Sequence, residues 1–369
     1  MLCQNENSLV SCVRGVGLDK QIDIKKILVT GGAGFIGSHV VKILLDRYSV
    51  PVRVMHLPRD NMINLEGLDV ELFAGDITNA DDVKAAVAGC DVVFHLAAVY
   101  ALWLPDMSVM DKVNVQGTKK LFDECVAQGV TRVIYTSSFA RFAGQGMDAT
   151  CDETSPFALD YSYYSKTKYE SHRMAEAYAK NGLDIVIVNP VCPLGPGDYG
   201  PTPTGRVVAD AFELPVIVGV HTESNYIDVR DCAMGHVLAL EKGRSGESYI
   251  LGNENMAHPD LMKVLQKVVG IRRPVVSVKP GALLPLAHLT EAVAKYITGQ
   301  PPFMTPVELK ISQAGLIADA SKAKNELGLP SRPIEETLFD AVQWFVANGY
   351  IKNKAICRKF AVPVALNVQ

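Results

Sequence analysis

The sequence TGGAGFIGSH, residues 30–39, decides the expected fold because it joins an apolar run to a helical pattern. It directly follows the β-rich run KKILVT (25–30), and its glycines fall at Gly31, Gly34 and Gly37. Such a loop turns tightly, lets the backbone approach a pyrophosphate and presents free N–H groups at a helix N-terminus. The strand before it and the helix after it favour a dinucleotide-binding loop over a merely tight βα turn, which is the alternative.

Strand and helix patterns alternate through the first half of the chain. Apolar runs of strand length lie at 25–30, 50–57, 70–76, 90–97, 130–138 and 183–190, and helical patterns lie at about 36–47, 80–88, 109–128 and 164–181. This alternation predicts a parallel sheet covered by helices on both faces. We therefore expect an α/β fold of the Rossmann type, doubly wound and mostly parallel, over residues 25–190.

A change of composition marks the end of this pattern. The segment VCPLGPGDYGPTPTG (191–205) is rich in proline and glycine. We expect residues 191–369 to form mainly a smaller, substrate-binding lobe, with some segments returning to the first domain. Residues 1–24 are expected to be a short leader, loosely attached, because they contain no continuous apolar stretch of the kind that a secretory signal has.

Composition and charge argue against several classes of protein. The chain has 369 residues, 48% of them hydrophobic, and a net charge of −4, so no basic footprint for nucleic acid is present. No apolar run of about 18 residues indicates a membrane span. The eight cysteines are scattered without a Cys-x-x-Cys pair, and the histidines show no ligand spacing, so we expect a cytoplasmic protein without a metal site.

The spacing Gly-x-x-Gly-x-x-Gly, together with later motifs, resembles the extended short-chain dehydrogenase/reductase family, also described as the NAD-dependent epimerase/dehydratase family. The motifs, spread over about residues 25–350, are GDI (75–77), HLAA (95–98), NVQGT (114–118), YTSS (135–138), YYSKTK (163–168), PLGPGD (193–198) and YIDVRD (226–231). Within the family the chain is similar to dihydroflavonol-reductase-like members, and among these to the group labelled hopanoid-associated sugar epimerases, through NLEGLDVE (64–71) and YILGNEN (249–255).

The resemblance implies a catalytic set of Ser138, Tyr164 and Lys168. Tyr164 and Lys168 lie one helical turn apart, so the ammonium and an oxidised nicotinamide would favour the phenolate and lower the pKa of Tyr164. In reduction Tyr164 would protonate a carbonyl oxygen while Ser138 holds that oxygen by a hydrogen bond. Ser137 is the alternative serine.

Six other side chains near these motifs have either a functional or a structural interpretation. Asn114 would support a water path to Lys168 or serve capping and packing, and His95 is more typical of a core histidine than of a catalyst. Trp103 would line a substrate pocket or simply pack. Tyr161, Tyr163 and Tyr169 are expected in the core or on the pocket surface.

The cofactor expected from the resemblance is NADP, with NAD as the alternative. The implied contacts are Gly31, Gly34, Phe35, Ile36, Gly37, Arg59, Asp76, Ile77, Leu96, Ala97, Ala98, Tyr164, Lys168 and Pro190. The choice rests on VRVMHLPRD (52–60), which has no acid at the strand end to bind both ribose hydroxyls. Arg59 lies just beyond the strand, where an arginine meets the 2′-phosphate of NADP, whereas Asp60 falls late for the acid.

The chemistry expected is the NADP-dependent reduction of a small ketone or aldehyde to an alcohol. Dehydratases of the family carry Asp-Glu after the catalytic residue, where this chain has Phe139 and Ala140, and the Val-Tyr-Gly of epimerases is replaced by Arg-Phe-Ala-Gly. The alternatives are a nucleotide-sugar epimerase with tightly bound NAD(P) and a non-catalytic NAD(P)-binding regulator. The resemblance also implies a homodimer built from paired helices.

Overall fold

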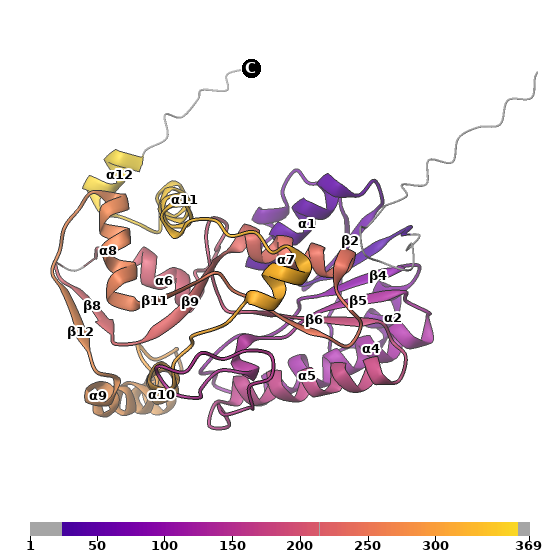
Figure 1. Cartoon of the computed structure of the whole chain (residues 1–369), viewed down its shortest axis with the longest axis horizontal. Coiled ribbons are helices and arrows are strands. Elements are labelled where there is room, and N and C mark those ends of the chain that lie inside the picture. Colours follow the sequence, from indigo (N-terminus) through magenta and orange to yellow (C-terminus); the bar gives the residue numbers. More distant parts are fainter. Residues whose placement is uncertain (1–23, 214, 361–369) are drawn as a thin grey trace, which may run out of the picture.

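The computed structural model describes residues 24–213 and 215–360. Its larger domain is built on a seven-stranded sheet in which all neighbouring strands are parallel (Figure 1). The expected leader therefore lies almost wholly outside the described residues. The strands are β1 (Ile27–Thr30), β2 (Val52–His56), β3 (Glu71–Ala74), β4 (Val92–His95), β5 (Arg132–Thr136), β6 (Ile185–Pro190) and β10 (Ser248–Leu251).

The order of these strands is β10-β6-β5-β4-β1-β2-β3, so the chain reverses its direction of travel across the sheet between β1 and β4. In such sheets ligands bind at this reversal, outside the carboxyl ends of the strands. The predicted Rossmann-type fold class is confirmed. β10 enters the same sheet beside β6 although it lies late in the chain.

Helices cover both faces of the sheet, each face with its own hydrophobic core. On one face α1 (Phe35–Arg47) packs over β1 and β2, beside α7 (Val229–Lys242), which packs over β5 and β6. On the other face lie α2 (Ala80–Val87), α4 (Thr118–Ala127) and α5 (Tyr163–Lys180), below the sheet in Figure 1. The two layers bury β1, β4 and β6 throughout, as the continuous apolar runs in the sequence indicate, whereas β3 at the edge of the sheet is largely exposed.

The long helix expected at 109–128 is irregular at its start. It begins as α3 (Ser108–Met110), continues as the π-helical segment η2 (Asp111–Gly117), and only then becomes α4. Asn114 lies buried in η2 and accepts a hydrogen bond from Val99 N at 2.7 Å. Its amide donates to Val99 O at 3.0 Å and to Thr167 Oγ1 at 3.1 Å, so Asn114 ties the segment after β4 to α5.

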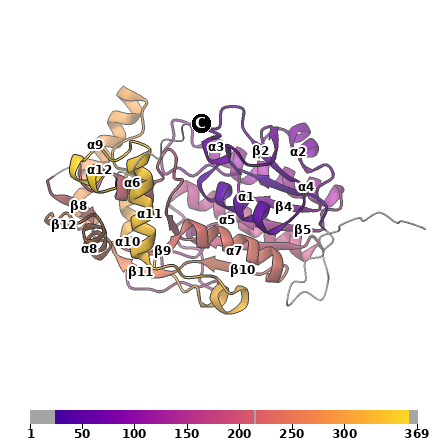
Figure 2. The same cartoon turned by 90° about the horizontal axis from the view of Figure 1, so that it is seen from above.

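A smaller lobe with a third hydrophobic core lies beside the carboxyl ends of the strands (Figures 1 and 2). Its strands are β7 (Cys192–Leu194), β8 (Ile217–Val220), β9 (Glu223–Asp228), β11 (Glu254–Ala257) and β12 (Val275–Val278). Its helices are α6 (Pro203–Ala209), α8 (His258–Val269), α9 (Pro280–Val293), η4 (Ala294–Thr298), α10 (Pro306–Ala314), α11 (Ile334–Ala347) and α12 (Lys354–Phe360). Short helical turns at η1 (Ile63–Leu65), η3 (Phe139–Arg141) and η5 (Ala323–Leu327) complete the described elements. No helix among residues 24–213 and 215–360 is long and apolar enough to cross a membrane.

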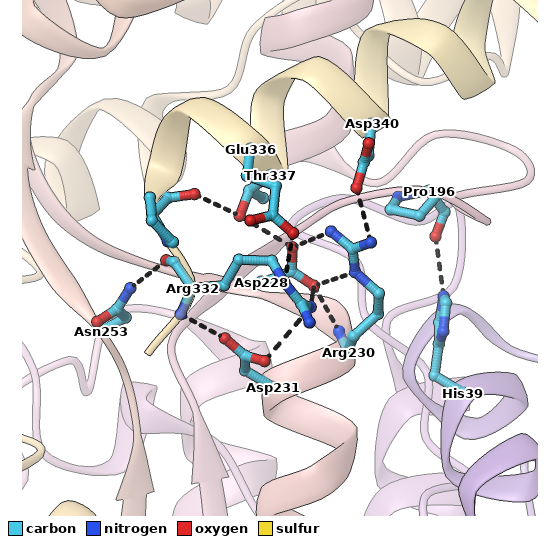
Figure 3. A network of polar contacts seen from close by, with 11 residues as sticks. His39, Pro196, Asp228, Arg230, Asp231, Asn253, Arg332, Glu336, Thr337 and Asp340 are labelled. Atoms are coloured by element: carbon cyan, nitrogen blue, oxygen red, sulfur yellow. Dashed lines mark hydrogen bonds and ion pairs between the residues drawn. The ribbon is translucent and has the colours of Figure 1, made fainter. Parts of the chain in front are cut away.

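A polar network holds the smaller lobe to the sheet domain (Figure 3). Arg230, in the first turn of α7, donates to Asp228 Oδ1 at 2.9 Å and forms an ion pair with Asp340 of α11 at 2.6 Å. Thr337, also on α11, donates to Asp228 Oδ2 at 2.9 Å. Burial opposes ionisation of Asp228, but the hydrogen bonds from Arg230 outweigh it and lower the pKa of this carboxyl. The network therefore fixes α11 against α7.

Candidate active site

The glycine loop between β1 and α1 is crowded at two of its three glycines. Gly31 has φ +70°, and a Cβ there would lie 2.7 Å from Ala97 N. A Cβ at Gly37 would lie 2.2 Å from Gly31 O. Both contacts are with backbone atoms that cannot move aside, so only glycine fits these positions.

Gly34 is the open position of the same loop. It is the N-cap residue of α1 and makes no side-chain capping bond, and a Cβ there would meet only Gly31 O, at 3.2 Å. Phe35 and Ile36 follow in the first helical turn, whose N–H groups have no partner within a helix. A bare backbone, a helix N-terminus and an open side together fit a pyrophosphate group.

The segment after β4 lies directly against this loop. Leu96 N donates to Thr30 O at 3.1 Å and Ala97 N donates to Thr30 Oγ1 at 3.3 Å. Ala98 follows and is exposed. His95 is buried between Thr30 Oγ1, 2.7 Å from Nδ1, and Thr118 Oγ1, 2.9 Å from Nε2. Burial lowers the pKa of His95 to about 3, so His95 is a neutral core histidine.

The far end of the expected cofactor groove is formed after β2 and β3. Asp76 is half-buried, and its Oδ1 accepts from Thr78 N at 2.8 Å, while Ile77 is buried against Gly117. Arg59 is exposed in the turn after β2 and has no ion pair with the described part of the chain. Pro190 ends β6 beside Leu251, several strands away from Arg59.

The other candidates for contact with a nucleotide ribose at this strand end are already engaged. Arg53 binds Glu71 Oε1 at 2.7 Å and the carbonyl oxygen of Ala86 at 2.7 Å. Asp60 accepts a hydrogen bond from Leu57 N at 2.9 Å and so closes its own turn. Of the basic residues in VRVMHLPRD, Arg59 is the one whose side chain stays exposed.

Ser138, rather than Ser137, lies against the tyrosine. Ser138 follows β5, and its hydroxyl lies close enough to Tyr164 to oppose the rise in the pKa of this phenol. Ser137 is 4% exposed and its Oγ lies 2.9 Å from Nδ1 of buried His172. The alternation of side chains along an extended segment sends the two serines to opposite sides, which explains the difference.

Helix α5 places the tyrosine and the lysine on one side. Ser162 caps the helix by accepting a hydrogen bond from Ser165 N at 3.2 Å, so Tyr164 lies in the first turn and Lys168 one turn later. Lys168 is buried, and its Nζ donates to Thr136 O at 2.8 Å. It also lies over the ring of Tyr135, 5.2 Å from the centroid.

Burial acts on the pKa values of both Tyr164 and Lys168. Burial raises the pKa of Tyr164 to about 12, against the lowering effect of Ser138. Burial also lowers the pKa of Lys168 to about 7, so its ammonium and neutral forms coexist near neutral pH. The predicted lowering includes an oxidised nicotinamide beside the phenol, so it stays a prediction. Within the chain itself, the loss of hydration outweighs the effect of Ser138 on the pKa of Tyr164.

A cavity of about 630 Å³ opens beside Tyr164. Trp103, Tyr161 and Tyr163 line it, whereas Tyr169 stacks on Phe157 at 4.4 Å outside it. The opposite wall comes from α9 and η4, including His288, Glu291, Lys295 and Tyr296.

Sequence reasoning missed this wall and also Tyr100, whose ring packs edge-on against Tyr164 at 4.8 Å. The signal for Tyr100 was its place in YALWLP, two residues after Ala98. The α9 wall had only a helical apolar pattern, which also fits a core helix.

Comparison with known proteins agrees with this geometry. Residues 27–252 match the model of the NAD dependent epimerase/dehydratase family. A Synechocystis protein named as a dihydroflavonol 4-reductase is 37% identical over 333 residues, which are 88% of this chain and 96% of that protein. Sterol demethylase protein B of Methylococcus capsulatus is 29% identical and covers 88% of this chain and 99% of its own length.

Solved structures show the same relationship. The crystal structure of gox2253 is 36% identical, with a TM-score of 0.78 over 89% of this chain and 100% of that chain. A nucleoside-diphosphate-sugar epimerase from Pseudomonas aeruginosa is 26% identical, with a TM-score of 0.72 over 89% of this chain and 99% of its own. With its parallel sheet, its glycine loop and these relatives, the chain belongs to the NAD-dependent epimerase/dehydratase family of extended short-chain dehydrogenases/reductases.

Proposed function

We propose that the protein reduces the carbonyl group of a small ketone or aldehyde with NADPH, using Ser138, Tyr164 and Lys168. The observation that carries this proposal is the position of Ser138 beside Tyr164, whose ring lines the cavity. This position supports two donors that converge on one substrate oxygen. Relatives that are named as reductases also support a reductase activity.

The side chains are suited to proton donation. A bound NADPH would supply the hydride for the carbonyl carbon. With a pKa of about 12, Tyr164 is protonated at neutral pH and can give its proton to the carbonyl oxygen as negative charge develops there. Ser138 donates a hydrogen bond to the same oxygen, and the ammonium form of Lys168 stabilises the phenolate that remains.

The cofactor contacts follow from the loop geometry. Gly34, Phe35 and Ile36 would hold the pyrophosphate, and Asp76 would face the adenine. Arg59 supports NADP because its exposed guanidinium is available to a 2′-phosphate. NAD is the alternative, since a 25% identical dTDP-glucose 4,6-dehydratase from Streptomyces venezuelae has a structure with NAD bound. We also propose a homodimer formed through helices of the sheet domain.

The test is an assay of NADPH oxidation with a panel of aliphatic, aromatic and polycyclic ketones and aldehydes. The original chain and the variants Tyr164→Phe and Tyr163→Phe are each assayed. Proton transfer by a positioned group contributes about 10² to 10⁴ in rate, so Tyr164→Phe should lower turnover by that range and keep NADPH binding. Tyr163→Phe is the matched control. The ring of Tyr163 also lines the cavity, but no role in proton transfer is proposed for it.

Two outcomes would contradict the proposal. One is an inactive Tyr163→Phe beside a fully active Tyr164→Phe, which would move the acid to the neighbouring position. The other is a protein that retains NAD(P) through purification, consumes no NADPH with any carbonyl compound and interconverts nucleotide sugars. That result would establish the epimerase alternative.

A further inference from the structure

Helix α9 and the turn η4 that continues it expose an apolar face. Its large side chains recur every three or four residues, as on one side of a helix. They are Leu286 (45% exposed), Leu289 (61%), Val293 (36%), Tyr296 (76%) and Ile297 (77%), and Phe303 in the following turn is 84% exposed. We call these six residues the α9 face.

The other two sides of the same helix already have partners. Ala287 and Ala294 are buried, and Thr290 Oγ1 donates to Met304 O at 2.7 Å, on the side that packs toward α10. His288, Glu291 and Lys295 line the cavity beside Tyr164. The folding of the lobe therefore uses two sides of α9, and the α9 face remains as a third side, which reaches the cavity at Tyr296.

The α9 face meets the cavity at Tyr296, which lines it. α9 is at the outer edge of the smaller lobe and protrudes from it in Figure 2. Across the cavity from η4 runs the apolar segment ALWLP (101–105), in which Leu102, Trp103 and Leu104 are half-buried and line the cavity. Two apolar segments thus flank one opening.

The segment that carries the α9 face has two lysines and one glutamate, and so a net positive charge. Between Lys279 and Val307 the only acidic residue is Glu291, which lines the cavity. Lys279 and Lys295 are exposed at the two ends of α9. An apolar strip of Leu, Ile, Tyr and Phe with flanking lysines is the pattern of a helix that lies in a membrane interface, where lysines meet anionic headgroups.

We propose that the α9 face docks on the surface of an anionic lipid bilayer and opens the catalytic cavity toward it. A second copy of the chain fits less well, because a two-fold contact would bring Lys279 and Lys295 of both copies around the same patch. An apolar carbonyl substrate would then pass from the bilayer between α9 and ALWLP toward Tyr164. This route rests on the proposed function, whereas the docking itself does not.

The test is co-sedimentation of the full chain with vesicles of phosphatidylcholine and phosphatidylglycerol in a 3:1 ratio (about 25% anionic lipid) and with vesicles of phosphatidylcholine alone. We expect binding to the anionic vesicles that is on the order of tenfold tighter than to the neutral ones. A triple variant, Leu289→Ser, Ile297→Ser and Phe303→Ser, should lower the partition coefficient on the order of 100-fold. Val126→Ser, at a 56% exposed valine on α4, is the matched control and should bind as the original chain does.

Three results would overturn the proposal. The first is absence of binding to both vesicle types, and the second is equal binding of the original chain and the triple variant. The third is a combination of two results: the original chain binds no vesicles, and sedimentation velocity shows it to be a dimer but the triple variant to be a monomer. That combination would make the α9 face a contact between copies. Phe303→Ser alone, at the most exposed position, repeats the test if thermal melting shows that the triple variant is unfolded. Neither substrate nor cofactor is present, so failure of the proposed reaction leaves these outcomes unchanged.

Discussion

The glycine loop and the α9 face lie on two sides of one site and are built in opposite ways. In the loop Gly31 and Gly37 are crowded by backbone atoms, and a Cβ at Gly37 would lie 2.2 Å from Gly31 O. On the α9 face, side chains as large as Ile297 and Phe303 are more than three-quarters exposed. The loop is defined by backbone contacts within the chain, whereas the α9 face acquires a role only through something outside it.

The largest effect is expected from Gly37→Ala. Its Cβ would overlap Gly31 O and distort the turn, so we expect a loss of about 3 kcal/mol of unfolding free energy and no measurable NADPH binding. Gly34→Ala is the matched variant, because its Cβ has one contact, at 3.2 Å, and its backbone is already compatible with alanine. It should keep the stability and weaken NADPH binding. Urea unfolding and nicotinamide fluorescence measure the two effects.

Equal stability of the two glycine variants would contradict the crowding described for Gly37. Unchanged NADPH binding by Gly34→Ala would separate the loop from the cofactor, because the open side of Gly34 is where the pyrophosphate is expected.

The two serines should show a crossed pattern of effects. Ser138→Ala removes a donor to the substrate oxygen, and we expect turnover to fall by about 10²-fold with little change in stability. Ser137→Ala leaves Nδ1 of buried His172 without its partner, at a cost of about 1–3 kcal/mol in unfolding free energy, with near-normal turnover. Steady-state kinetics and chemical unfolding of both variants test this. A reversed pattern would show that Ser137 is the active-site serine.

The stability of Lys168→Met should depend on pH relative to the original chain. Burial lowers the pKa of Lys168 from 10.5 to about 7, so between these values the unfolded chain binds more protons than the folded one. The stability of the original chain therefore rises with pH across this window, and the full cost of burying the cation is present below it. Lys168→Met lacks this cost, so its stability advantage should be greatest at pH 7 and shrink toward pH 10, while turnover is lost throughout.

Urea unfolding at pH 7 and pH 9 measures that difference. An advantage of equal size at both values would mean that Lys168 keeps an ordinary pKa and carries a full charge in the folded protein.

The smallest effect concerns cofactor choice. Arg59→Ala should reduce the preference for NADPH over NADH by about tenfold, the loss of one charge-assisted hydrogen bond at an exposed site. Arg53→Ala serves as the control, since its contacts with Glu71 and Ala86 predict a stability effect and no change of preference. Competition titrations with NADPH and NADH measure the ratio of the two affinities. An unchanged ratio in Arg59→Ala would favour NAD as the cofactor.

The sheet and the catalytic segment were predictable because each rests on local rules. Glycine spacing, strand alternation and the Tyr164–Lys168 interval are short-range patterns, and such patterns determine the local backbone structure directly. The pKa of Tyr164 was not predictable in this way, since it depends on how completely the surrounding chain excludes water from the phenol. Nor was the wall of the cavity at α9, which lies more than 120 residues from Tyr164 and comes to it only through the packing of the second lobe.

The central claim is that the open side of the glycine loop holds a reduced dinucleotide next to Tyr164. The most direct measurement is a titration of the original chain with NADPH, followed by nicotinamide fluorescence, with Gly34→Ala in parallel. The account predicts a saturable change that excess NADP⁺ reverses and that Gly34→Ala shifts to higher NADPH concentration. No change of fluorescence on mixing, or identical curves for the two proteins, would contradict it.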